Sequence, residues 1–206
     1  MTCTGVENMR KLVYAFYDPN VSFKTVTEGR PDLAGALTDC LSGDVNKDFS
    51  AMFEAFSRFR RKHDDAILYL HSMKRPGGNG LDLAALARVM GIPDDAVRFT
   101  PEFELHMGVE PWKMPYVFSQ FDVLACPSYG EGFGLPTVES QAAGTPVITT
   151  LCSASEELNP LGWQVDGEPF WNGVHKAWWI RPSIRGLYEA FMQAHEARED
   201  VDREKL

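Results

Sequence analysis

The chain has 206 residues, of which 44% are hydrophobic and 24% are charged, and this composition excludes disordered, collagen-like and coiled-coil proteins. Its net charge of -9 opposes a general attraction to nucleic-acid phosphates or to anionic lipid surfaces. No apolar run approaches the roughly 20 residues that cross a bilayer. We therefore expect a soluble, cytoplasmic protein with one main domain, no nucleic-acid partner and no transmembrane segment.

The four cysteines are Cys3, Cys40, Cys126 and Cys152, and they are far apart in the sequence. None forms the paired CxxC spacing that is typical of zinc or redox centres. We expect free thiols that are mostly buried, and no metal site.

The expected elements begin with a strand at 10–17, which is the one clear signal in residues 1–43, an N-terminal segment of uncertain structure. From there a regular alternation begins, and residues 44–206 are expected to form the main domain. The elements expected in this domain, in chain order, are a helix at 48–62, a strand at 66–70, a helix at 83–90, a strand at 97–100, a short helix at 114–121, a strand at 122–126, a helix from 136 to 144, a strand at 146–150, a brief helix at 153–158, a last strand at 178–180 and a long helix from 182 to about 199.

Short apolar strands that alternate with helices of about 10–15 residues indicate parallel βαβ units. Such units cross over with one handedness into a sheet that helices cover on both faces. The pattern predicts a Rossmann-like α/β domain with a parallel sheet. Ligands of these sheets bind where loops leave the carboxyl ends of the strands, so the loops after residues 70, 100, 126 and 150 are candidates.

One of these loops has the pattern of a phosphate-binding site. Residues 127–139 read PSYGEGFGLPTVE, with three glycines within five residues before a helix. Glycines permit a tight loop with exposed backbone, and the start of a helix offers free N–H groups and a partial positive charge to an anion. The glycines match neither GxGxxG nor the P-loop, so a Rossmann oxidoreductase or an ATP-binding enzyme has little support.

Two carboxylates flank this phosphate-binding position: Glu131 in the loop and Glu139 in the expected first turn of the helix. A carboxylate beside a phosphate is repelled unless it contacts something else, and sugar hydroxyls are good hydrogen-bond donors to carboxylates. A ligand with a sugar on each side of a diphosphate satisfies the loop and both acids. A nucleotide sugar has this layout.

The segment SYGEGFGLPTVESQAAGTPVI at 128–148 resembles the E-x7-E signature of family-4 retaining GT-B glycosyltransferases, in their C-terminal, donor-binding domain. The resemblance extends from about Val45 to Arg185 and includes the NKDF sequence at 46–49. It implies one half of a GT-B fold. It also implies a retaining hexosyltransferase that takes its sugar from a GDP- or UDP-hexose and needs no metal or other cofactor.

The resemblance also implies roles for individual residues. Glu139 would accept the ribose hydroxyls, Glu131 would hold the transferred hexose, and Lys47 would point at the departing diphosphate. The loop backbone would approach the diphosphate and the sugar at Gly132, Phe133, Gly134 and Leu135. Ser128 and His71 follow strands at the same edge and are further candidates for donor binding.

Each of these residues has a simpler interpretation. Glu139 could complement the helix dipole, Glu131 could be a solvated loop acid, and Lys47 could be an exposed lysine at a helix start. At the position of His71 the family more often has glycine, and a histidine there is more often satisfied or exposed than catalytic. For the tryptophans we expect packing rather than a sugar platform; they are Trp112, Trp163, Trp171, Trp178 and Trp179.

A full GT-B enzyme has two Rossmann-like domains of roughly 150–200 residues each, with the reaction between them. The 206 residues have room for one, so we expect the acceptor domain on a missing N-terminal part or on a partner chain. The family also usually has an arginine shortly before the lysine, and residues 41–46 contain none. A non-catalytic nucleotide-sugar-binding or assembly module is the alternative.

Overall fold

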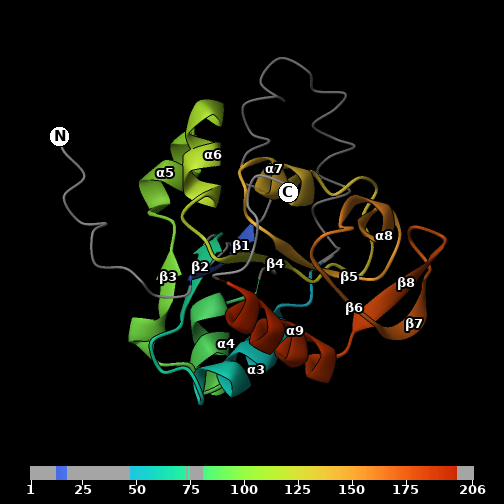
Figure 1. Ribbon diagram of the computed structural model, residues 1–206, viewed down its shortest axis with the longest axis horizontal. Coiled ribbons are helices and arrows are strands. Elements are labelled where there is room, and N and C mark those ends of the chain that lie inside the picture. The colour runs from blue at the N-terminus through green and yellow to red at the C-terminus, as the bar shows by residue number, and fades with distance from the viewer. Residues whose placement is uncertain (1–12, 18–46, 73, 75–80, 199–206) are drawn as a thin grey trace.

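The computed structural model describes residues 13–17, 47–72, 74 and 81–198 (Figure 1). Within these residues the main sheet has six strands in the spatial order β3-β2-β1-β4-β5-β6, and each neighbouring pair is parallel. The strands are β1 (Val13–Tyr17), β2 (Ile67–His71), β3 (Val97–Phe99), β4 (Val123–Cys126), β5 (Val147–Thr150) and β6 (Trp163–Val165). This sheet confirms the predicted Rossmann-like α/β fold, and it places the carboxyl ends of the strands along one edge.

Strand β1 changes the expected division of the chain. It comes from the segment whose structure we left uncertain, yet it pairs with β2 on one side and with β4 on the other, in the middle of the sheet. Residues 13–17 thus belong to the same sheet as the later strands. Residues 1–12 and 18–46 lie outside the described part of the chain, so for them the boundary at residue 44 stays a prediction.

One face of the sheet is covered by α3 (Phe49–Arg60), α4 (Leu83–Val89) and α9 (Ile184–Ala197), as Figure 1 shows. The apolar side chains of α3 recur at helical spacing and point at the sheet and at α9. Phe56 and Phe191 are fully buried there, with ring centroids 6.2 Å apart. Burial of each such ring stabilises the fold by roughly 2–3 kcal/mol.

The other face carries a second core, in which Phe118, Leu124 and Val147 are buried. Its helices are α5 (Glu102–Met107), α6 (Met114–Phe118), α7 (Leu135–Ala142) and α8 (Ala154–Leu158). Two short 3-10 helices are η2 (Asp94–Ala96), which precedes β3, and η3 (Pro111–Lys113), which precedes α6. Helix α5, η2 and η3 lie where we expected no element. No helix in the described part of the chain is long and apolar enough to span a membrane.

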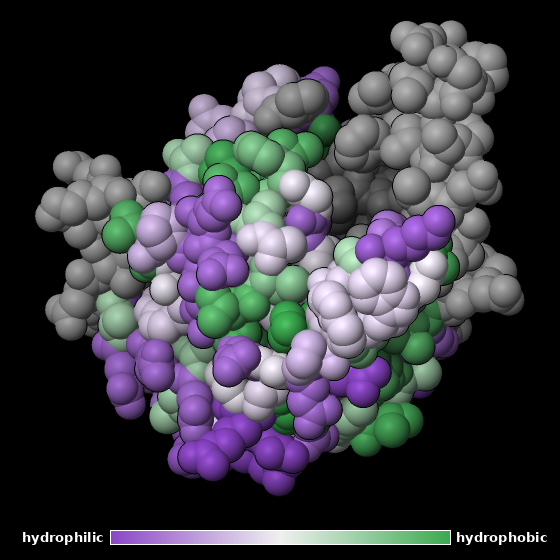
Figure 2. Space-filling model, turned by 90° about the vertical axis from the view of Figure 1, so that its right-hand side faces the viewer, coloured by the Kyte–Doolittle hydropathy of each residue, from purple (hydrophilic) through white to green (hydrophobic). Residues whose placement is uncertain are grey.

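A separate β-hairpin projects from this α/β body. It consists of β7 (Gly167–Asn172) and β8 (Ala177–Pro182), which pair in antiparallel fashion. The strand expected at 178–180 is therefore β8, but it does not join the main sheet, whose edge is formed by the unpredicted β6. Figure 2 faces this side of the molecule, where hydrophilic and hydrophobic surface are mixed.

The tryptophans correct one expectation. Trp179 is buried and Trp163 packs partly against the main core, as expected. Trp112, Trp171 and Trp178, however, keep 64%, 53% and 66% of their surface exposed, so the packing interpretation is wrong for these three. In the hairpin the reason is geometric, because successive side chains of a strand point to opposite faces.

Candidate functional site

The candidate site lies at the carboxyl edge of the sheet, in the loop that connects β4 to α7. Lys47 precedes the first turn of α3, and its backbone forms an isolated antiparallel bridge with Ser128 of this loop. The next residue, Asp48, caps α3 by accepting a hydrogen bond from the N–H of Ala51. Its own N–H donates to the carbonyl of Pro127 over 3.2 Å. These bonds fix the start of α3 against the end of β4.

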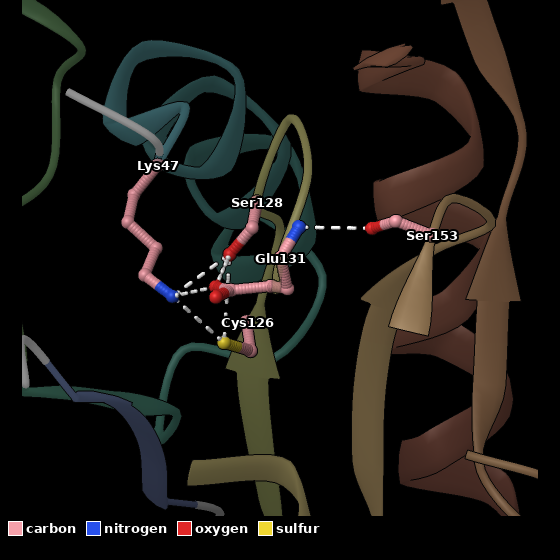
Figure 3. Close-up of polar contacts among 5 residues, drawn as sticks. All are labelled: Lys47, Cys126, Ser128, Glu131 and Ser153. Atoms are coloured by element: carbon pink, nitrogen blue, oxygen red, sulfur yellow. Dashed lines mark hydrogen bonds and ion pairs between the residues drawn. The ribbon is translucent and has the colours of Figure 1, made fainter. Parts of the chain in front are cut away.

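The Lys47 ammonium lies among three acceptors at this point (Figure 3). Its Nζ is 2.5 Å from Oε1 of Glu131, 2.8 Å from Oγ of Ser128 and 3.3 Å from Sγ of Cys126. Ser128 in turn donates its hydroxyl to the same Glu131 oxygen. Two residues that the sequence proposed for catalysis and one proposed for donor binding are therefore in direct contact.

This cluster is shielded from water. Lys47 is 8% exposed, and the Glu131 side chain is 16% exposed. Burial by itself lowers the pKa of Lys47, but Cys126 and Glu131 outweigh it and raise this pKa above its ordinary value, so the residue stays an ammonium ion. Lys47 is not an exposed helix-start lysine, and Glu131 is not a solvated loop acid.

The following part of the loop is open. Gly132 and Phe133 are exposed, and Gly134 begins α7 in the left-handed region, at φ +82°. The structure gives no hydrogen bond from the backbone N–H groups of residues 132–135 to any part of the chain it describes. These groups are gathered at the start of a helix, where an anion would be stabilised.

Glu139 does not lie where we expected it. Helix α7 begins at Leu135 and has no acidic residue in its first turn, so Glu139 belongs to the second turn. The helix starts one residue earlier than predicted, because Gly134 turns the chain into it and Pro136 follows inside the helix. The dipole interpretation of Glu139 loses force, since that effect falls off within the first turn. Glu139 is exposed as a whole residue, and partial burial of its carboxyl group raises its pKa.

His71 is the last residue of β2 and lies buried at the same edge. Its Nδ1 is 3.0 Å from the hydroxyl oxygen of Thr100, which also contacts the hydroxyl of Tyr69. Burial lowers the pKa of His71 to about 4, so the ring is neutral at physiological pH. A satisfied, buried histidine fits these contacts, while binding of the donor by His71 stays a prediction.

Sequence reasoning missed two residues of the site. Ser153 precedes α8, a position from which a serine normally caps its own helix. Instead its hydroxyl accepts the N–H of Glu131 over 2.9 Å, and its φ is +53°. Cys126 was expected only as a buried thiol. No local pattern could have placed either residue, because their contacts join distant parts of the chain.

The expectation of free, buried thiols is confirmed for Cys126 and Cys152, whereas Cys3 and Cys40 lie outside the described residues. In the part of the chain that the structure describes, no three His, Cys, Asp or Glu side chains are grouped as a metal ion would require.

The family model of glycosyl transferases group 1 matches residues 40–169. The chain belongs to this family. A stretch of 101 residues is 38% identical to a D-inositol 3-phosphate glycosyltransferase from Corynebacterium kroppenstedtii and covers 47% of this chain but 21% of that relative. This chain thus spans a small part of the relative's length.

Solved structures agree on the fold. The Anabaena protein HepE in complex with UDP-glucose has a TM-score of 0.58 at 14% identity, over 94% of this chain and 41% of HepE. The C-terminal domain of a group 1 family protein from Francisella tularensis has a TM-score of 0.54 at 14% identity, over 92% of this chain and 80% of that domain. The chain therefore has the fold of the C-terminal, Rossmann-like half of a GT-B glycosyltransferase.

Proposed function

We propose that this group 1 glycosyltransferase domain binds a GDP- or UDP-hexose at the loop between β4 and α7, for transfer of the hexosyl group with retention of configuration. The observation that carries the proposal is the contact between the buried Lys47 ammonium and Glu131, directly beside the open amides of residues 132–135. A cation, an acid and free backbone donors at one point match the diphosphate and the sugar of one ligand.

The diphosphate is assigned to the open half of the loop and to Lys47. Backbone amides of Gly132 to Leu135 would donate to its oxygens, and the partial positive charge of the α7 start would add to their field. Lys47 would neutralise the charge that grows on the diphosphate as the glycosidic bond breaks. This interaction is stronger in the transition state than in the ground state, so it accelerates the reaction and needs no metal ion.

The two sugars are assigned to the two acids. Glu131 and Ser128 would bind hydroxyls of the transferred hexose, and Glu139 would accept hydroxyls of the ribose. Glu131 contacts Lys47 in the structure, so the donor would replace each partner of this ion pair: the diphosphate takes the ammonium, and the hexose takes the carboxylate. Each buried charge then keeps a partner. A buried charge without a partner would be strongly destabilising.

The acceptor is assigned to a further domain. Because the matched part of the C. kroppenstedtii relative is 21% of its length, we propose that groups which bind and deprotonate the acceptor belong to an N-terminal domain or a partner chain. That further domain would then present the reacting hydroxyl to the hexose.

Calorimetry with UDP-glucose and with GDP-mannose tests donor binding. We expect Glu139→Ala and Glu131→Gln each to weaken the binding of the preferred donor about ten- to a hundredfold, or roughly 1.5–3 kcal/mol, because each removes a charged hydrogen-bond acceptor. Glu157→Ala changes an exposed acid on α8 and serves as the matched control. Absence of binding by the parent protein, or equal binding by all variants, contradicts the proposal.

Catalysis is tested by adding the N-terminal domain of a group 1 relative and following the product by NMR. We expect hexosyl transfer or donor hydrolysis that Lys47→Ala abolishes, with the anomeric configuration of the donor kept in the product. Donor binding without any turnover would instead support the non-catalytic module.

A further inference from the structure

The inner face of the β7–β8 hairpin packs against the loop that connects β4 to α7, which we call the donor loop. The N–H of Ile180 in β8 donates to the carbonyl of Tyr129 over 2.9 Å. The Tyr129 ring lies edge-on to Phe170 at 5.4 Å between centroids and nearly parallel to Trp179 at 6.3 Å. Tyr129 stands between Ser128 and Glu131, so the hairpin contacts the loop in the middle of the candidate site.

Gly130 shows how close this contact is. A Cβ atom at this position would lie 2.9 Å from both Cδ1 and Nε1 of Trp179, closer than real Cβ atoms come to other atoms. The backbone of Gly130 is not in the left-handed region, unlike that of Gly134. The residue at 130 is therefore restricted to glycine by the indole of Trp179, and not by its own conformation.

Among the described residues, no contact of this kind is found on the outer face of the hairpin. Trp171 and Trp178 form a cross-strand pair with ring centroids 5.6 Å apart, and both are more than half exposed. Trp178 and Trp179 are neighbours in β8, yet one is 66% and the other 8% exposed. Of these two consecutive tryptophans, Trp179 contacts the donor loop and Trp178 is on the opposite face of the strand.

Other contacts hold the same residues from different sides. Ser153 accepts the N–H of Glu131, and Lys47 binds the side chains of Ser128 and Glu131. The Tyr129 hydroxyl shares a hydrogen bond with Asp48. Its pKa is raised to about 12, mainly by burial and secondly by the charge of Asp48. Without the hairpin, Tyr129 would lose the hydrogen bond from Ile180, and Gly130 would lose its contact with Trp179.

We propose that the β7–β8 hairpin is a positioning element for donor recognition, in which Trp179 packs on Tyr129 and Gly130 and thereby aims Glu131 and Ser128 at the transferred hexose. Trp179 is a positioning residue, since it acts through the loop and touches no donor group itself. The inference rests on the proposed function, and it makes recognition of the hexose depend on the hairpin. Binding of the nucleotide is assigned to residues 132–139 and to Lys47, and within the described part of the chain no hydrogen bond or ring contact joins residues 132–139 to the hairpin.

The first test compares Trp179→Ala with Trp178→Ala as the matched control. Each protein is titrated with UDP-glucose and UDP, and with GDP-mannose and GDP. We expect Trp179→Ala to weaken the binding of the preferred nucleotide sugar about tenfold and that of its free nucleotide less than about threefold, while Trp178→Ala changes neither by more than about twofold. Equal losses for sugar and nucleotide would mean a merely structural role and would overturn the proposal.

A second measurement needs no ligand. Hydrogen exchange of the full chain should show the Glu131 and Ile180 amides exchanging at least about tenfold faster in Trp179→Ala, and unchanged in Trp178→Ala. Unchanged exchange at both amides in Trp179→Ala overturns the positioning role, whether or not a nucleotide sugar binds. If the parent binds neither pair of ligands, the proposed function fails, and this measurement still decides on the hairpin.

The third test is a double-mutant cycle between Gly130 and Trp179. Gly130→Ala should speed exchange of the Glu131 amide in the parent, because its Cβ displaces the indole, but should add little in the Trp179→Ala background. Trp179→Phe, which keeps an aromatic ring, should retain slow exchange. Additive effects of Gly130→Ala and Trp179→Ala would show that the contact between Gly130 and Trp179 is not the cause of the slow exchange.

Discussion

The two halves of the loop between β4 and α7 differ in how the protein holds them. Residues 127–131 are fixed from three directions, by the start of α3, by Ser153 and by the hairpin. Residues 132–135 are held by none of these described elements, and within the described part of the chain their amides donate no hydrogen bond. The first half carries the charged side chains, and the second half carries only backbone donors.

This difference has a physical reason. Under the proposed function, the Glu131 carboxylate would have to keep one direction to recognise one hexose, and holding it in place before the ligand arrives would avoid an entropic cost on binding. Backbone amides at a helix start already point the same way because the helix orients them. Under the proposed function, hydrogen bonds from these amides to the protein would compete with the phosphate.

The largest effect on stability is expected in the fixed half. Lys47→Met leaves the Glu131 carboxylate shielded from water without its cation, so the free energy of unfolding should fall by about 3–5 kcal/mol in a denaturant titration. The double variant Lys47→Met/Glu131→Gln should recover most of this loss. Arg58→Gln, which breaks an exposed ion pair with Glu54, should cost no more than about 0.5 kcal/mol. Equal losses for Lys47→Met and Arg58→Gln would contradict a buried pair.

The free energy of unfolding should depend on pH through His71, which ends β2 at the same edge of the sheet. Its pKa is lowered to about 4 in the folded protein from an ordinary 6.5, so between these values the unfolded chain binds the proton more tightly. The stabilisation is complete above pH 6.5 and is lost as the pH falls toward 4, by up to about 3 kcal/mol. The stability difference between the parent and His71→Gln should shrink over this range. A difference that does not vary with pH would show that His71 is not buried as a neutral ring.

In residues 132–135, the cost of replacing a glycine should depend on its backbone conformation and not on the space around its Cβ. Gly134→Ala should cost about 1–2 kcal/mol, because an alanine is strained at φ +82° although the nearest atom to its Cβ would be 3.7 Å away. Gly132→Ala, with open space around its Cβ and no positive φ, should change the free energy of unfolding by less than about 0.5 kcal/mol. Thermal unfolding of the two variants separates these cases, and equal costs would argue against the conformational reason.

The smallest effect is expected for Phe133→Ala. Its side chain is 55% exposed, and only its backbone is assigned to the donor. Stability should change by less than about 0.5 kcal/mol, and the affinity for the preferred nucleotide sugar by less than about twofold in calorimetry. A tenfold loss of affinity would show that the ring itself contacts the donor.

Much of the fold and part of the site could be predicted from the sequence. Apolar runs and helical spacing predicted β1 to β5 and most of the helices, though not α5, because these signals are local. The loop motif singled out Glu131 and, through its likeness to a known family, Lys47. Glu139 was expected in the first turn of α7 and lies at the start of the second, because the helix begins one residue earlier than predicted.

The sequence by itself determined the alternation of strands and helices and the glycine loop between β4 and α7, because spacing along the chain encodes both. Only the tertiary structure decided that Lys47 and Glu131, 84 residues apart, form a shielded ion pair, and that Trp179 but not Trp178 faces the loop. Such contacts depend on which strands become neighbours and on which face a strand turns toward the core. Those outcomes follow from the free energy of the whole chain, and no local segment encodes them.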